Sequence, residues 1–474
     1  MNKISTIDDV AKKFYDGMTI MIAGFNGICC PIKLIEKLVE SKVKDLTLIS
    51  ITCGHPGGGF DLAPLFVNKQ VKKVITSHTG TSPEATKYYK ENGMEVEYLP
   101  MGIWAECIRA GGFGLGGVVS PIYRGDEKKL GKTVVTLEDG KEYVIEKPLR
   151  ADVCFVKAYK GDAYGNLQFR KVGATTNTIL ATAADYTIAE VNEIVEVGDI
   201  PMDQVGVSGA FVSAIVKGVD MDEQEVIYQE LWDSRGKLAK SDDVPSCDPN
   251  DFREVIARRA ALEINDGDVV NLGIGMPTAA ANYLDEGKFV LLHAENGLLG
   301  YGKTPVVGTQ DSDIFNAGAQ PVTVIPGAST FDQCTSFGII RGGKVNTSVL
   351  GTLEVDQEGN IANWGMELEP GSGRIWPGMG GAMELVAGAN KVVVVMQHTD
   401  KKGNAKILKR CKLPLTGQGV VDVIITEKAV FNITKDGLVL KEIFPGLTVD
   451  DIKQITEADF TVASDLCEYQ KAIV

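Results

Sequence analysis

The chain has 474 residues, of which 44% are hydrophobic and 23% charged, and its formal net charge at pH 7 is −15. This length is enough for two or three domains with sizeable cores, and the composition is that of a soluble globular protein. The acidic balance argues against nucleic acid or an anionic membrane as the main partner, although a local pocket could still hold an anionic ligand.

Signals for targeting, disulfides and metals are absent from the sequence. The first residues contain no apolar signal core, and the longest apolar runs, such as residues 392–396, are too short to span a bilayer. Nine cysteines occur without a C-x-x-C spacing, and Cys29 and Cys30 are adjacent, which disfavours a disulfide between them. The four histidines are scattered singly, so the sequence predicts no metal site. These features predict a cytoplasmic protein with free thiols and no membrane segment.

In the first half of the chain, short apolar runs alternate with helical patterns. The runs at residues 19–23, 46–50 and 71–75 are expected to form strands. A glycine loop follows the first of them, and Pro31 is expected to open a helix. A charged segment around residues 123–147 predicts an additional hairpin.

A polar segment at residues 232–249 predicts a linker, because it contains two prolines and no hydrophobic period. A helix is expected to begin after Asp248 or Asn250. The predicted organisation is a first domain at residues 1–232, a linker at 233–250 and a second domain at 251–474.

The second half repeats the plan of the first. Residues 266–272 again place Asp-Gly before an apolar strand, and a glycine loop at residues 273–277 follows. The turn at residues 162–167 is echoed at residues 356–361. We interpret this as one α/β unit used twice, which predicts two related, open, mainly parallel-sheet domains in tandem. Ligand sites are common in the cleft between such domains.

Glu295 is the most informative residue of the chain. It follows an apolar run at residues 288–294 that predicts a buried strand, and Asn296 with Gly297 predicts a tight turn with positive φ. A carboxylate is therefore expected at a strand tip, where parallel-sheet proteins build their sites. With an ordinary pKa of about 4.3, it would be ionised at neutral pH and could act as a nucleophile. The alternative is an ordinary glutamate in a strand turn.

Residues 297–304 match the G-x-x-x-x-G-K-[ST] pattern of nucleotide-binding phosphate loops. A helix should then begin at Lys303 and Thr304, but residues 305–308 continue a helix poorly. A P-loop NTPase is therefore a disfavoured alternative.

Glycine clusters also follow or precede predicted elements elsewhere in the chain. Their backbone N–H groups could hold a phosphate or an oxyanion, or the glycines could simply allow close packing. These clusters lie at residues 24–27, 273–277 and 378–382.

The motifs form a combination that extends along nearly the whole chain. Its principal parts are residues 16–31 and 292–300, and further parts lie at residues 108–112, 149–152, 271–277, 326–329, 340–343, 378–382 and 413–417. This combination resembles the signatures of the 3-oxoacid CoA-transferase family, also called family I CoA-transferases. The α and β subunits, which are separate in many members, look fused here, as in the succinyl-CoA:3-ketoacid enzymes, and butyrate–acetoacetate CoA-transferases are also similar.

The resemblance implies an acyl-CoA:carboxylate CoA-transferase with an α-like first domain and a β-like second domain. A ping-pong mechanism would pass through a glutamyl-CoA thioester on Glu295, with coenzyme A as substrate and covalent intermediate and no permanently bound cofactor or metal. The backbone N–H groups of Gly381 and Ala382 are expected to stabilise the oxyanion. The implied CoA contacts lie in the first glycine loop, at Gly24, Phe25, Asn26, Gly27, Ile28, Cys29 and Cys30.

The implied partners are acyl-CoA and small carboxylic acids of short-chain fatty acid and ketone body metabolism. The resemblance also predicts a homodimer or homotetramer. No nucleic acid or membrane partner is expected.

Three departures from the family pattern occur. Ala294 replaces a serine, Met101 replaces a glutamine, and Ile51 with Thr52 replaces an asparagine that donates to the oxyanion in relatives. Met101 and Thr52 are therefore expected to make the acyl pocket less polar, with a preference for acetate, propionate or butyrate over 3-oxoacids. The alternative is that Met101 merely packs in the core.

Two other functions are alternatives to CoA transfer. An acyl-CoA thioester hydrolase would use Glu295 but admit water, and a non-catalytic sensor on a related α/β fold would not need Glu295. The sequence leaves open the acyl donor and acceptor, the physiological direction and the oxyanion donor of the first half.

Overall fold

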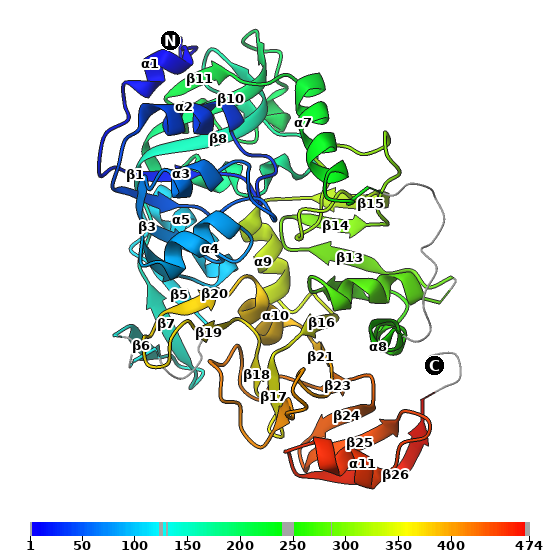
Figure 1. Cartoon of the computed structure of the whole chain (residues 1–474). Coiled ribbons are helices and arrows are strands. Elements are labelled where there is room, and N and C mark those ends of the chain that lie inside the picture. Colours follow the sequence, from blue (N-terminus) through cyan, green and yellow to red (C-terminus); the bar gives the residue numbers. More distant parts are fainter. Residues whose placement is uncertain (1, 123–126, 129–130, 239–250, 286, 470–474) are drawn as a thin grey trace. The chain divides into compact units, whose positions relative to one another are not determined.

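Parallel strands joined by helices form the framework of the protein. The computed structural model describes residues 2–122, 127–128, 131–238, 251–285 and 287–469. The chain divides into two compact units, and Figure 1 labels the helices and strands that build them. The first unit comprises Met1–Asp242, Ala294–Gly338 and Leu368–Gly381, and the second comprises Asp243–His293, Ile339–Glu367 and Ala382–Val474. The predicted α/β class, with mainly parallel sheets in two tandem domains, is confirmed. The proposed boundaries between α-like and β-like regions stay a prediction.

A mainly parallel sheet is the core of the first unit. Its strand order is β11-β10-β8-β1-β2-β3-β4, in which all neighbours are parallel, and β9 pairs antiparallel with β8. The strands are β1 (Thr19–Ile22), β2 (Leu46–Ile49), β3 (Val71–Thr76), β4 (Glu95–Tyr98), β8 (Ala151–Asp162), β9 (Leu167–Gln168), β10 (Ala184–Val195) and β11 (Ala214–Lys217). Their apolar residues, such as Ile20, Leu48 and Val74, are fully buried. Strands of a parallel sheet that is covered on both faces have continuous apolar sequences, as these runs do.

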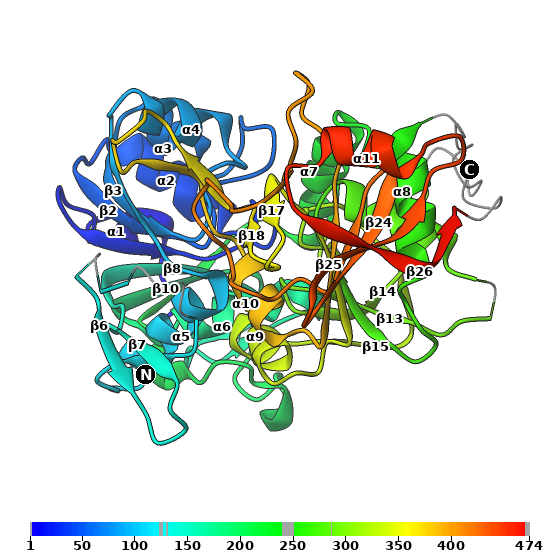
Figure 2. The same ribbon diagram turned by 90° about the horizontal axis from the view of Figure 1, so that it is seen from below.

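Helices cover both faces of this sheet. Figure 2 shows α2, α3 and α4 on one face and α5 and α6 on the other, as in a doubly wound fold. The helix that Pro31 was expected to open is α2, whose first residue is Ile32. The helices of this unit are α1 (Ile7–Ala11), α2 (Ile32–Ser41), α3 (Ala63–Val67), α4 (Pro83–Lys90), α5 (Met101–Gly112), α6 (Asn177–Leu180) and α7 (Met221–Asp233).

Smaller antiparallel elements complete the first unit. The predicted hairpin corresponds to β6 and β7, which form a small sheet with β5, although residues 123–126 and 129–130 lie outside the described part. A second antiparallel pair, β14 and β15, follows Glu295. The bounds are β5 (Val118–Ser120), β6 (Thr133–Thr136), β7 (Glu142–Glu146), β14 (Leu298–Tyr301), β15 (Val324–Thr330) and β20 (Ile375–Pro377), and α9 spans Gln333–Arg341.

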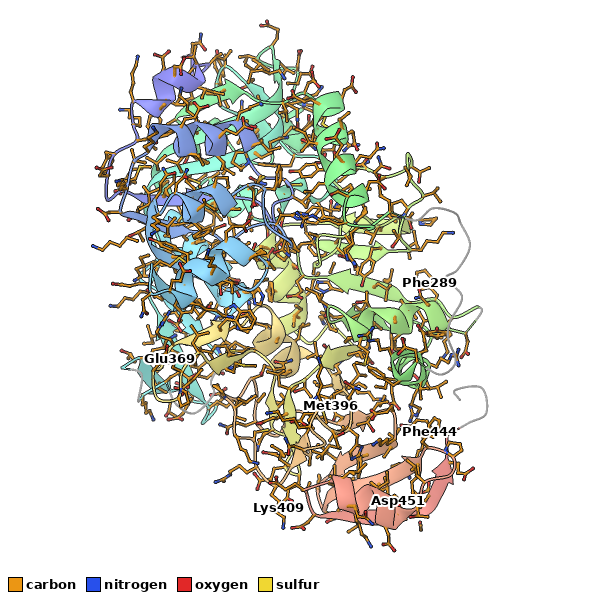
Figure 3. All side chains as sticks on the ribbon, in the orientation of Figure 1. Phe289, Glu369, Met396, Lys409, Phe444 and Asp451 are labelled. Atoms are coloured by element: carbon orange, nitrogen blue, oxygen red, sulfur yellow. The ribbon has the colours of Figure 1, made fainter. Side chains whose placement is uncertain are left out.

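The second unit is built around a sheet of order β13-β12-β16-β21-β23-β24-β25-β26. The neighbours from β13 to β23 are parallel, whereas β24 pairs antiparallel with both β23 and β25. Side chains fill the space between its elements (Figure 3), and Phe444 packs against Tyr469 with ring centroids 6.0 Å apart. The strands are β12 (Val269–Leu272), β13 (Leu291–Ala294), β16 (Thr347–Gly351), β21 (Lys391–Val395), β23 (Val423–Ile425), β24 (Ala429–Thr434), β25 (Gly437–Ile443) and β26 (Phe460–Glu468).

The remaining elements of the second unit are short. A small sheet has the order β18-β17-β22. The bounds are β17 (Glu354–Asp356), β18 (Ile361–Ala362), β19 (Gly365–Glu367), β22 (Ile407–Leu408), α8 (Phe252–Ala261), α10 (Ala382–Gly388) and α11 (Val449–Ile455). Asp251 caps α8 by accepting a hydrogen bond from Arg253 N–H, whereas residues 239–250, most of the predicted linker, lie outside the described part. No helix among the described residues is both long and apolar enough to cross a membrane.

The similar sequences at residues 162–167 and 356–361 form the same kind of turn. Asp162 Oδ1 accepts hydrogen bonds from the backbone of Tyr164 and Asn166, and the Asn166 amide donates to Asp162 Oδ2 at 2.9 Å. Asp356 and Asn360 make the same set of bonds, also with 2.9 Å between Asn360 Nδ2 and Asp356 Oδ2. The turn predicted at both positions therefore forms with the same hydrogen bonds, and Asp400 with Asn404 makes this set as well.

Candidate active site

Glu295 lies immediately after β13, at the tip of the strand, as predicted. The turn is closed by a hydrogen bond of 3.0 Å from Gly297 N–H to the Ala294 carbonyl, and Gly297 has φ +103°. Asn296 is fully buried and donates to the Phe315 carbonyl at 2.7 Å. The Asn-Gly pair therefore anchors a tight turn, and this turn fixes the backbone of the glutamate.

The Glu295 carboxylate lies against Gly381. A Cβ atom built on Gly381 would overlap Glu295 Oε2 and would lie 2.7 Å from Cδ of the same side chain and 3.1 Å from Phe337 Cζ. Only glycine permits this approach, because every other residue has a Cβ. Two residues predicted from separate motifs are thus adjacent within the first unit.

Burial changes the acidity of this carboxyl group. The protein surroundings remove water from Glu295 and raise its pKa to about 7. The expectation of full ionisation at neutral pH is therefore wrong, because the ordinary pKa of about 4.3 applies only to a hydrated carboxyl. Burial, together with the nearby Glu295 charge, also raises the pKa of the Tyr301 phenol. A carboxyl that titrates near neutrality is a candidate catalytic group.

The glycine loop at residues 24–30 is held by hydrogen bonds at Gly24 and within the loop. Gly24 N–H donates to Thr176 Oγ1 at 2.9 Å, and the Thr176 hydroxyl donates back to the Gly24 carbonyl at 3.1 Å. Phe25 and Ile28 exchange two backbone hydrogen bonds. All the predicted CoA-contacting residues are buried: Gly24, Phe25, Asn26, Gly27, Ile28, Cys29 and Cys30. Their role in CoA binding stays a prediction.

Thr52 supports this loop from the end of β2. Its hydroxyl accepts a hydrogen bond of 3.2 Å from Asn26 N–H. The two residues line a small cavity that has room for about one water molecule, together with Asp61. Asp61 accepts from His55 N–H at 3.0 Å, and burial raises its pKa to about 7. Sequence reasoning missed Asp61, because nothing in its local pattern indicates burial.

Met101 and Thr52 both lie near the loop that contains Gly381. Met101 is buried at the start of α5, and its N–H donates to the Gly380 carbonyl at 3.0 Å. Isolated β-bridges join Thr52 to His78 and His78 to Gly378. The two residues assigned to the acyl pocket are therefore in one neighbourhood of the first unit, although what they bind stays a prediction.

The segment that matches a phosphate-binding loop forms a hairpin instead. Residues 298–301 are strand β14, which pairs antiparallel with β15. Backbone hydrogen bonds of 2.8 Å join Gly302 N–H to the Thr323 carbonyl and Thr323 N–H to the Lys303 carbonyl. No helix starts at Lys303 in the described chain, so the P-loop alternative is not supported.

Comparisons with known proteins agree with the motif pattern. The model of the coenzyme A transferase family matches residues 3–218 and 253–454. Human mitochondrial succinyl-CoA:3-ketoacid coenzyme A transferase 2 is 38% identical over 98% of this chain and 90% of its own length. The acetate CoA-transferase subunit beta of Escherichia coli is 50% identical over 46% of this chain and 96% of that subunit. One relative thus matches 98% of the chain, and the other matches about half of it as a separate subunit.

Solved structures show the same fold. An acyl-CoA transferase (YdiF) from Escherichia coli O157:H7, crystallised as the apoenzyme, aligns with a TM-score of 0.79 over 100% of this chain and 96% of its own. A thioester complex of the same enzyme with CoA aligns with a TM-score of 0.75. At 22% sequence identity, these alignments establish the fold alone.

The comparisons contradict the predicted cytoplasmic location. The human relative and two mouse relatives, 39% and 38% identical over 96% of this chain, are mitochondrial proteins, although bacterial β subunits also match. Composition and apolar runs could not reveal this, since they report on membrane insertion and not on the compartment in which a folded protein works.

Proposed function

Because this chain belongs to the coenzyme A transferase family, as a 3-oxoacid CoA-transferase with fused subunits, we propose that it transfers CoA through a thioester on Glu295. The observation that supports this mechanism is the Glu295 carboxylate at a strand tip, partly withdrawn from water and in contact with Gly381. A desolvated carboxylate is more nucleophilic than a hydrated one, and with a pKa of about 7 it is still half ionised at neutral pH.

The proposed exchange takes two steps on each side. A Glu295 oxygen attacks the acyl-CoA carbonyl, the C–S bond breaks, and CoA leaves as the thiolate, which produces an acyl-glutamyl anhydride. The thiolate then attacks the glutamyl carbonyl, the anhydride C–O bond breaks, and the donor acid leaves as a carboxylate. A second carboxylate reverses both steps. One thioester replaces another, so the reaction needs no external energy source.

The oxyanion that forms on the glutamyl carbonyl needs hydrogen-bond donors. We assign this role to the backbone N–H of Gly381, a residue on which an added Cβ would overlap Glu295 Oε2, and to the next N–H along the chain, that of Ala382. We assign CoA binding to residues 24–30, because their backbone is fixed by bonds from Thr176 and Thr52. No resident cofactor or metal is part of the proposal.

Trapping the covalent intermediate tests the mechanism. Incubation with an acyl-CoA alone, followed by borohydride, should leave a reduced adduct at Glu295 that mass spectrometry locates, with release of CoA. The matched control is the same treatment of Glu295→Gln, which has no nucleophilic carboxylate. Rapid hydrolysis of acyl-CoA without any acceptor acid, with no trapped adduct, would instead establish a thioester hydrolase.

Substrate choice forms a separate part of the proposal. The names of the relatives include 3-ketoacid and acetate transferases, so short-chain and 3-oxo acids both fall within the proposed substrate class. We propose that Met101, where the family pattern leads us to expect glutamine, favours butyrate over acetoacetate, because an apolar wall offers no donor to a keto oxygen. The test is the ratio of kcat/KM for the two acids with one donor, in wild type and Met101→Gln. Equal or better use of acetoacetate by the wild type contradicts the proposal.

The proposed domain organisation follows the α and β subunits of the family. We propose an α-like region at residues 1–232 and a β-like region at 251–474, joined by residues 233–250, acting as a homodimer or homotetramer. Coexpression of residues 1–232 and 251–474 as separate chains should restore transferase activity if the boundaries are right. Light scattering measures the assembly.

A further inference from the structure

Two donors from different elements of the first unit bind the Gly380 carbonyl. The backbone N–H of Met101 donates to it at 3.0 Å, and the hydroxyl of Ser77 donates to it at 3.1 Å. Met101 begins α5, and Ser77 follows directly after β3 and is completely buried. A carbonyl oxygen has two lone pairs, so these two bonds fix its direction fully.

The loop at residues 377–380 also runs along the turn that follows β3. Gly380 N–H donates to the Ser77 carbonyl at 3.1 Å, and Thr79 N–H donates to the Pro377 carbonyl at 2.8 Å. A Cβ on Gly378 would lie 2.7 Å from the Ser77 carbonyl oxygen and 2.9 Å from His78 Cα. The loop is therefore held by the turn that follows β3 and not only by its own chain neighbours.

The direction of the Gly380 carbonyl determines the direction of the next N–H group. In a planar trans peptide, the C=O of one residue and the N–H of the next point to opposite sides. Because the carbonyl faces Ser77 and Met101, the N–H of Gly381 faces away from them. We propose that Ser77 is a positioning residue whose hydroxyl holds the peptide bond between Gly380 and Gly381, so that the Gly381 N–H faces the Glu295 carboxyl group.

This inference rests on the proposed thioester at Glu295, because the N–H acts when charge develops on the glutamyl oxygen. A donor that is already held in place needs no reorganisation during the reaction. Gly380 has φ +55°, and a glycine backbone rotates easily when its bonds are removed. Loss of the Ser77 hydroxyl therefore affects the rate of reaction more than the binding of substrates.

The test compares three variants with the wild type. Ser77→Ala should lower kcat roughly tenfold, as a small misplacement of a reacting group does, while KM for acyl-CoA and for the acid stays within about twofold. Ser77→Thr keeps the hydroxyl and should recover most of kcat. If the threonine variant does not fold, Ser77→Cys, which keeps the size but is a weak donor, should resemble Ser77→Ala.

Ser82→Ala is the matched control. Ser82 is also a fully buried serine, and its hydroxyl caps α4 by accepting from Ala85 N–H at 3.2 Å. This variant should lower the Tm and leave kcat unchanged, because a cap contributes to stability alone. A similar loss of kcat in Ser82→Ala would show that general destabilisation explains both results, which overturns the inference.

A single-turnover measurement separates this inference from the proposed function. With acyl-CoA alone, the wild type should form the borohydride-trapped adduct at Glu295, and Ser77→Ala should form it about tenfold more slowly. An adduct that forms equally fast in both proteins overturns the role of Ser77 and leaves the mechanism standing. If the wild type forms no adduct, the proposed function fails, and the inference fails with it.

Discussion

The residues that follow two corresponding strands, β2 and β13, differ in their surroundings. The repeated plan pairs β1 with β2 and β12 with β13, each pair parallel. Beyond β2, the Thr52 hydroxyl accepts a hydrogen bond from Asn26 N–H and holds the neighbouring loop. Beyond β13, Glu295 presents a carboxyl with a pKa raised to about 7 by burial. The Thr52 tip therefore holds a loop by a hydrogen bond, whereas the Glu295 tip carries the buried carboxyl group that we propose as the nucleophile.

Removal of the carboxylate beyond β13 should have the largest effect. Glu295→Ala is expected to lower kcat by at least about a thousandfold, because the residue is the proposed nucleophile and no neighbour replaces it. The measurement is steady-state transfer from acyl-CoA to acetate, with the Tm as a control for folding. Turnover close to that of the wild type would contradict the assignment of Glu295 as the nucleophile.

Gly381→Ala should have the next largest effect. The added methyl group would overlap the Glu295 carboxylate, so either the carboxylate or the backbone donor must move, and we expect a loss of roughly a hundredfold in kcat. Gly338→Ala is the matched control, since Gly338 lies in α9 and a Cβ there meets no atom within 4 Å. If both alanine variants keep wild-type kcat, Gly381 is not at the reacting group.

The pH dependence of activity should follow the Glu295 carboxyl. Because its folded pKa is about 7, kcat/KM should fall about tenfold per pH unit below pH 7, as the nucleophilic carboxylate is protonated. An activity that stays constant down to pH 5 would assign the reaction to a group of ordinary acidity.

Stability gives an independent measurement of the same group. A folded pKa of about 7, above the ordinary value of about 4.3, means that the charged form destabilises the folded state, with the cost growing from about pH 4.3 to pH 7. The Tm of Glu295→Gln should therefore match that of the wild type near pH 4 and exceed it at pH 8. A Tm difference that is independent of pH would contradict the raised pKa.

Thr52→Val, at the other strand tip, should have the smallest effect on catalysis. The substitution leaves the buried Asn26 N–H without its partner, which costs about 1–3 kcal/mol of unfolding free energy. We expect kcat to change less than about fivefold, because no reacting atom is removed. A loss of kcat comparable to that of Glu295→Ala would show that both strand tips take part in the chemistry.

Much of the fold could be predicted from the sequence because its signals are local. The runs that became β1, β2 and β3 are apolar and short, and the Asp-Asn turns at residues 162–166 and 356–360 form the same bonds from the same residue types. Glu295 could be placed at a strand tip for the same reason, since an apolar run precedes it and an Asn-Gly turn follows.

Other features depend on residues that lie far apart in the chain, and these emerge only in the folded protein. Folding placed Ala294–Gly338 and Leu368–Gly381 in one unit with the N-terminal sheet, which the repeated halves did not indicate. It raised the pKa of Glu295, because desolvation depends on every atom packed around a group. It also brought Ser77 to the Gly380 carbonyl, a contact that no local pattern contains. Element types and the nucleophile candidate could be read from the chain alone, because hydrophobic periodicity and turn chemistry act between neighbouring residues. The acidity of Glu295 and the orientation of backbone donors arise only when distant segments pack together.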